Sequence, residues 1–194
     1  MEAFSDGVMA VLITIMVLEL KVPHGHDLPA LAPLLPVFLG YVLSFTFLGI
    51  YWNNHHHMFQ AVKHINGPVL WANLHLLFWL SLVPVVTTWV GENHDAMAPT
   101  ALYGFLLLMA GFAYTILEAA LKRIDGNREI LERAVGADLK GKLTLVAYML
   151  GIAASFVRPW IGQLFYLGVA LVWLIPDPRI ERELIATHRR EGNS

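Results

Sequence analysis

Long apolar runs separated by short polar segments dominate this sequence. An α-helix needs roughly 20 apolar residues to cross the hydrocarbon core of a bilayer, and the runs are close to this length. Backbone groups inside lipid must be satisfied within the protein, so such runs fold as helices. We therefore predict an all-α integral membrane protein with one six-helix transmembrane domain over residues 1–194. The predicted helices are 3–22, 32–53, 67–90, 99–121, 143–157 and 160–175.

The composition agrees with a membrane location. Only 14% of the residues are charged, whereas soluble domains carry about 25%. The first run is not typical of a signal peptide, because no Lys or Arg precedes Lys21 and Asp6 lies near its start. The final apolar run, 143–175, is too long for one span. We divide it at Arg158-Pro159, since proline cannot continue a helix and disfavours helix at the residue before it.

The basic residues predict the orientation. If the first helix starts in the cytoplasm, only Lys21 and Arg158 of the 13 Lys and Arg residues lie in outside segments. The positive-inside rule then places both termini in the cytoplasm. A five-span arrangement would put the C-terminal arginines outside, so the same rule favours six spans. The polar segment 122–142, which contains Ile130, Leu131 and Val135, is either an amphipathic helix at the inner surface or a solvated loop.

Several kinds of function are excluded by residue type. The chain has no cysteine, so disulfides, thiol nucleophiles and cysteine-ligated metals are ruled out. A net charge of −2 gives no indication of a nucleic-acid partner. No nucleophile lies near a base and no span contains a carboxylate pair, so we predict that the protein is not an enzyme. Glu118 is four residues before Lys122, which predicts a helix-surface ion pair.

The first helix begins with polar residues and continues as an apolar segment. Ser5 is a good N-cap and Asp6 suits the first turn. An ionisable residue at a membrane boundary also indicates a functional or assembly contact, because it is costly there unless paired or hydrated. Val11, Ile15 and Leu18 form one helical stripe, which we call the apolar stripe, with Thr14 beside it. Periodicity cannot distinguish lipid-facing from pore-facing residues in a helix that is apolar all round.

Histidines gather near the end of the second predicted span. His55, His56 and His57 are consecutive, so they point about 100° apart on a helix, and no histidine pair has the i, i+4 spacing typical of helical metal ligands. His75, in the third span, is placed to meet His55 or His56. We predict no structural metal and no cofactor, and proton sensing is the alternative role. The predicted hydrogen-bond network at the inner boundary comprises Trp52, His55, His56, Asn73 and His75.

Three segments resemble one known family. "FSDGVMAVLITIMVLELKVP" is similar to the first helix of the bacterial single-repeat relatives of the endosomal/lysosomal potassium channel, which is marked by a Phe-Ser-Asp signature. "YWNNHHHMF" resembles the family's Trp-x-x-His-His segment, and "NLHLLFWLSLVP" carries its Asn and late Pro. The signature arginine of the family would fall before Met1, so the resemblance leaves the partner of Asp6 open. No TVGYG-type selectivity loop occurs in the sequence.

The resemblance implies a homotetramer in which the first helix lines a central pore. Val11, Ile15 and Leu18 would then face the pore as apolar rings that act as a hydrophobic gate, and Thr14 would supply a hydroxyl linked to potassium preference. Phe4, Ser5 and Asp6 would hold the helix against its neighbours.

The implied partners are potassium as the permeant ion, the lipid bilayer and further copies of the chain. The location would be the plasma membrane of a bacterium. The alternatives are a proton-coupled secondary transporter that uses His75, Glu118 or Asp6, and a non-conducting assembly scaffold.

Overall fold

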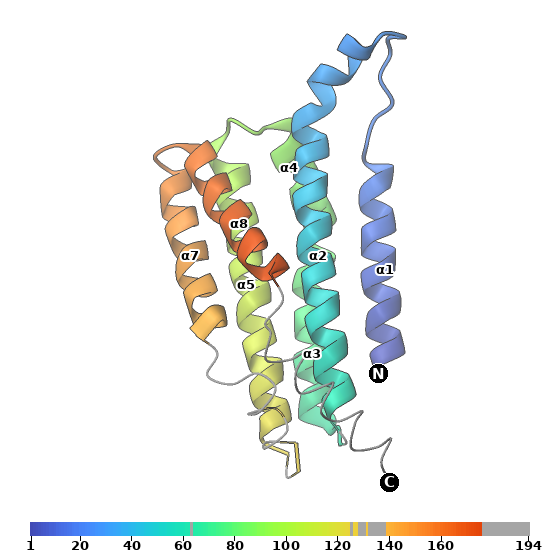
Figure 1. The fold of residues 1–194 in the computed structure, drawn as a ribbon, viewed down its shortest axis with the longest axis vertical. Helices are drawn as coiled ribbons and strands as arrows, with labels where there is room; N and C mark the ends of the chain where they lie inside the picture. The colour runs from blue at the N-terminus through green and yellow to red at the C-terminus, as the bar shows by residue number, and fades with distance from the viewer. Residues whose placement is uncertain (63, 125, 128–130, 132–138, 176–194) are drawn as a thin grey trace.

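The computed structural model describes residues 1–62, 64–124, 126–127, 131 and 139–175, and it shows an elongated bundle of helices (Figure 1). All regular structure in these residues is helical, so the prediction of an all-α fold is confirmed. The elements are α1 (Glu2–Leu18), the 3₁₀ helix η1 (Leu28–Leu34), α2 (Leu35–Ala61), α3 (Gly67–Ser81), α4 (Val83–Glu92), α5 (Met97–Lys122), α7 (Leu139–Ser155) and α8 (Pro159–Leu174).

The ends of two helices differ from the predicted bounds. α1 stops at Leu18, before the predicted end at Val22, and Pro23 follows, which disfavours helix at the residue before it. α2 continues to Ala61, well beyond Asn53. His55, His56 and His57 therefore lie within α2. The helix continues past the point where the apolar sequence ends.

The third predicted span is interrupted, which corrects the prediction of one continuous helix over 67–90. α3 ends at Ser81 and α4 begins at Val83. Pro84 has no N–H to donate to the preceding turn, and its ring clashes with the carbonyl four residues back. The Leu82 N–H donates to the Trp79 carbonyl at 3.3 Å, and the Val86 N–H donates to the Leu82 carbonyl at 3.2 Å. The chain thus changes from one helix to the next at Leu82.

The long helix α5 lies at the centre of the bundle and contacts α3, α4, α7 and α8. Gly104 on α5 meets Tyr166 of α8, and a Cβ at this glycine would overlap the tyrosine hydroxyl. A buried polar contact joins three further elements, because Ser44 Oγ of α2 lies 2.6 Å from Thr87 Oγ1 of α4 and 2.8 Å from the Tyr103 hydroxyl of α5. These paired hydroxyls hold α2 and α4 against α5 without leaving an unsatisfied polar group.

Among the described residues, three helical segments are long and apolar enough to cross a membrane: Leu28–Ala61, Gly67–Glu92 and Met97–Lys122. α8 is a shorter apolar helix of 16 residues. α1 has 17 residues, which gives a length of roughly 26 Å. Most of segment 122–142, predicted as an amphipathic helix or loop, lies outside the described residues. So does the C-terminal tail with Arg179, Arg182, Arg189 and Arg190.

Candidate pore-lining helix and its anchor

The helix α1 has one buried and one exposed face. Ser5, Met9, Leu12 and Met16 follow each other at intervals of three or four residues and are buried. This face packs on α2, α3 and α4. In Figure 1, α1 stands at one edge of the bundle, next to α2. The other side of α1 is therefore left open by the described part of the chain.

The apolar stripe lies on this open side of α1. Val11 is 54% exposed, Ile15 is 42% exposed and Leu18 is 79% exposed. Thr14 is exposed beside them, and its hydroxyl donates to the Val11 carbonyl at 2.8 Å. The Thr14 oxygen keeps lone pairs that can accept from water or contact a cation. All four residues predicted to line a pore thus share one uncovered face.

A chain of hydrogen bonds fixes the first turn of α1 to α3 and α2. The Asn73 amide Nδ2 donates to Ser5 Oγ at 2.9 Å, and Asn73 Oδ1 lies 2.7 Å from His55 Nε2. Because an amide oxygen only accepts, His55 carries its proton on Nε2 in this arrangement. Ser5 and His55 are fully buried and Asn73 is 2% exposed. We call Ser5, Asn73 and His55 the α1 anchor.

More exposed contacts lie beside the α1 anchor. The Trp52 indole N–H donates to Asp6 Oδ1 at 3.0 Å. Glu2 Oε1 lies 2.8 Å from His56 Nδ1, an ion pair when the ring is protonated, although the angle between them does not suit a hydrogen bond. Phe4 is exposed on the open side of α1, whereas Ser5 and Asp6 each form a hydrogen bond to a neighbouring helix.

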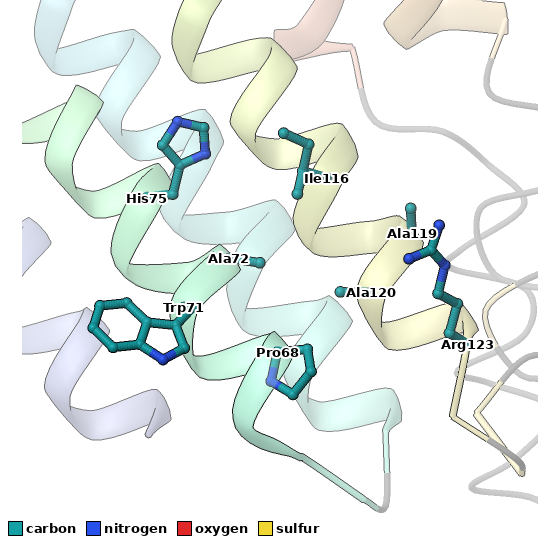
Figure 2. A pocket seen from close by; sticks show the side chains of 8 residues that line it. All are labelled: Pro68, Trp71, Ala72, His75, Ile116, Ala119, Ala120 and Arg123. Atoms are coloured by element: carbon teal, nitrogen blue, oxygen red, sulfur yellow. The ribbon is translucent and has the colours of Figure 1, made fainter.

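His75 lies apart from the other residues of the predicted network. Its Nε2 accepts from the Trp79 indole N–H at 2.9 Å. Figure 2 shows that His75 lines a shallow groove between α3 and α5, toward the end of the bundle where α1 begins. The other lining residues are Pro68, Trp71, Ala72, Ile116, Ala119, Ala120 and Arg123. Nearby, Glu118 and Lys122 form the predicted ion pair on α5.

Sequence reasoning missed two members of the site. Glu2 and Gln60 were not singled out, yet Glu2 contacts His56 and the Gln60 amide lies 2.8 Å from His56 Nε2. Glu2 and Asp6 are four residues apart on α1, a spacing that puts both carboxylates on one face. This spacing predicts that the two carboxylates lie on the same face of α1, but it does not predict which residue of α2 they contact.

Comparisons with known proteins agree with one another. A family model described as "Endosomal/lysosomal potassium channel TMEM175" matches residues 1–84. A potassium channel from Chryseobacterium sp. is 56% identical over 184 residues, 95% of this chain and 96% of the relative. One from Streptomyces collinus is 32% identical over 80% of this chain and 81% of its own. The crystal structure of a lysosomal potassium-selective channel TMEM175 homolog from Chamaesiphon minutus matches with a TM-score of 0.76. It has 26% identity over 90% of this chain and 94% of that one.

Proposed function

The chain belongs to the TMEM175 family of ion channels, which are not enzymes, and we propose that it conducts potassium passively across a membrane. The observation that carries this proposal is the 56% identity, over nearly the full length of both chains, to a protein named a potassium channel. The whole chain, residues 1–194, acts as one six-helix transmembrane channel domain. Its bacterial relatives favour the plasma membrane of a bacterium as its location.

The pore lies against the open side of α1, between copies of the chain. The support is the division of α1 into two apolar faces, of which only one is covered within the described residues. Four copies around one axis would bury the apolar stripe of each α1 against the others and enclose a narrow passage. The homotetramer also accounts for an exposed helix edge that carries Val11, Ile15 and Leu18.

The apolar stripe acts as the gate. Rings of large apolar side chains exclude water from a narrow pore and so stop ions, whereas a slight widening lets water and ions return. Thr14 acts as the selectivity element, because its hydroxyl oxygen can replace part of the hydration shell of an ion. Potassium is more weakly hydrated than sodium, and a tenfold preference requires only about 1.4 kcal/mol.

Both termini lie in the cytoplasm in this proposal. α1 begins and α5 ends at the same end of the bundle (Figure 1), where Lys122 and Arg123 lie, and Lys140 and Lys142 are in the first turn of α7 toward this end. Lys21 follows α1 and Arg158 precedes α8, at the opposite end. The excess of basic residues at the first end favours an inside position for it. The α1 anchor is therefore near the inner surface, and Leu18 is near the outer one.

We expect Thr14→Val to lower the preference for potassium over sodium. Valine keeps the branched shape but removes the hydroxyl oxygen that contacts the ion, so the expected loss is about tenfold or less, equivalent to about 1.4 kcal/mol. The measurement is the flux of each ion through purified protein in liposomes. Thr115→Val is the matched control, because Thr115 is an exposed threonine of α5 whose hydroxyl also bonds its own helix.

The same flux assay distinguishes the alternatives. Unchanged preference in Thr14→Val would move the selectivity element elsewhere on α1. Absence of passive flux of either ion through the parent protein would contradict the channel proposal. Ion movement that requires a proton gradient would then favour the proton-coupled transporter, and no movement under any gradient would favour the scaffold.

A further inference from the structure

We propose that the groove between α3 and α5 binds one anionic phospholipid, with the lipid phosphate on Arg123 and one acyl chain along the groove. We call the hollow drawn in Figure 2 the α3–α5 groove. The inference rests on the membrane location of the chain. It does not depend on the channel proposal, because the lining residues lie on α3 and α5 and directly after α5, away from the apolar stripe.

Small side chains form the floor of the α3–α5 groove. The two helices pack against each other, and Ala72 of α3 lies with Ala119 and Ala120 of α5 along the groove. Methyl groups fill little of the space between two helices, so a hollow of about 460 Å³ remains. This volume is within the range of about 300–1,000 Å³ that is typical of ligand pockets. The hollow runs along the two helices (Figure 2), which suits an extended acyl chain.

The two ends of the α3–α5 groove lie at different depths of the bilayer. Its walls belong to two helical segments that are long and apolar enough to cross a membrane, Gly67–Glu92 and Met97–Lys122. Arg123 directly follows the second segment, so it lies at the boundary where lipid headgroups begin. Ile116 is about two turns earlier on α5, roughly 10 Å deeper in the apolar region. A phospholipid has the same order, with a charged phosphate at the boundary and hydrocarbon below it.

The polar side chains of the groove match the polar part of a phospholipid. Arg123 is exposed, and Figure 2 shows its side chain extending along α5 toward Ala119. A guanidinium can donate two parallel hydrogen bonds to one phosphate. Trp71 is 75% exposed, and tryptophan is enriched at the level of lipid headgroups. Because His75 Nε2 accepts from the Trp79 indole N–H, the neutral ring carries its proton on Nδ1 and can donate to an ester carbonyl.

The charges favour an anionic lipid as the occupant. Among the described residues that line the groove, only Arg123 carries a permanent charge. The cation next to it, Lys122, pairs with Glu118, so Arg123 supplies the positive charge at the mouth of the groove. Basic pockets between membrane helices bind anionic headgroups. A free phosphate ion would contact Arg123 and leave the apolar groove unfilled, whereas a phospholipid occupies both parts.

The test measures lipid binding to the full chain by native mass spectrometry, after titration in detergent with phosphatidylglycerol or phosphatidylcholine that carry the same acyl chains. We expect one tightly bound phosphatidylglycerol per chain and about fivefold weaker binding of the zwitterionic phosphatidylcholine. Arg123→Gln should remove this preference. Ala119→Phe should weaken the binding of both lipids by about tenfold, because its ring displaces part of the acyl chain and each displaced CH₂ group costs roughly fourfold.

Two residues outside the groove provide matched controls. Arg158→Gln removes an arginine between α7 and α8, and Ala153→Phe places the same ring on α7, so both should keep the lipid affinities of the parent. All four positions are exposed, so the variants should fold. Equal effects of Arg123→Gln and Arg158→Gln, or of Ala119→Phe and Ala153→Phe, would overturn the proposal. So would a loss of subunits in Ala119→Phe alone, seen in the same spectra, because a second copy of the chain would then occupy the groove.

Discussion

Asn73→Leu is expected to lower the free energy of unfolding by about 3 kcal/mol. Leucine has a similar shape but cannot donate to Ser5 Oγ or accept from His55 Nε2. Both of these groups are fully buried and would lose the partner that satisfies them, and each such loss costs about 1–3 kcal/mol. Denaturant titration of the purified protein in detergent measures the change.

The control for this prediction is Asn53→Leu. Asn53 is an exposed residue of α2, so the same replacement there removes no buried contact and should change stability by no more than about 0.5 kcal/mol. Equal effects of the two substitutions would mean that the α1 anchor does not hold α1 to α2 and α3.

Ile15→Asn is expected to raise the basal potassium flux by about tenfold or more. A ring of amides holds water where a ring of isoleucines excludes it, so an apolar constriction becomes wet without having to widen. A barrier lower by about 1.4 kcal/mol is sufficient for a tenfold faster rate. The measurement is potassium efflux from liposomes that contain equal amounts of parent and variant protein.

Leu150→Asn is the matched control for the gate. Leu150 is an exposed apolar residue of α7, which lies on the opposite side of the bundle from α1 (Figure 1). An asparagine there faces away from the proposed pore and should leave the flux unchanged. A similar rise in both variants would indicate general leakage, and no rise in Ile15→Asn would exclude the apolar stripe as the gate.

The helical fold was predictable because membrane insertion leaves a strong pattern in the sequence. Residues 67–92 and 97–122 are apolar over a length that matches a bilayer, and a helix satisfies the backbone hydrogen bonds of such a segment within itself. The break at Leu82 was not predicted, although Pro84 was visible. Membrane helices often contain a proline, because neighbouring groups satisfy the backbone carbonyl that the proline leaves without a hydrogen bond. The presence of a proline therefore does not show whether a helix is kinked or ends there.

The candidate site was only partly predictable. The four residues predicted to line a pore were selected by helical spacing combined with a family resemblance. Composition alone does not select them, because Val11 and Leu12 are equally apolar and only their burial distinguishes them. The contact of Glu2 with His56 depends on how α1 and α2 pack, which single-helix spacing cannot reveal. For the same reason His75 was expected beside His55, whereas it turns toward the groove between α3 and α5.

Two kinds of contact hold α1 against the rest of the bundle. At the inner end, the α1 anchor uses buried hydrogen bonds, which have a defined direction and so fix the rotation of the helix about its axis. Further along, Met9, Leu12 and Met16 supply apolar packing on the same face. Because the anchor sets the rotation, Val11, Ile15 and Leu18 are all directed to the open side of the chain.

The most direct test of the claim that α1 lines the pore uses a single cysteine, since the chain has none. Leu18→Cys places a thiol at the outer end of the apolar stripe, and Phe156→Cys places one on an exposed residue between α7 and α8 at the same end of the bundle. Both variants in liposomes are treated with a charged methanethiosulfonate reagent, and mass spectrometry verifies that each thiol is modified. The account predicts that modification stops most of the potassium flux through Leu18→Cys, reversibly on reduction, and leaves Phe156→Cys unaffected. Undiminished flux through fully modified Leu18→Cys would contradict it.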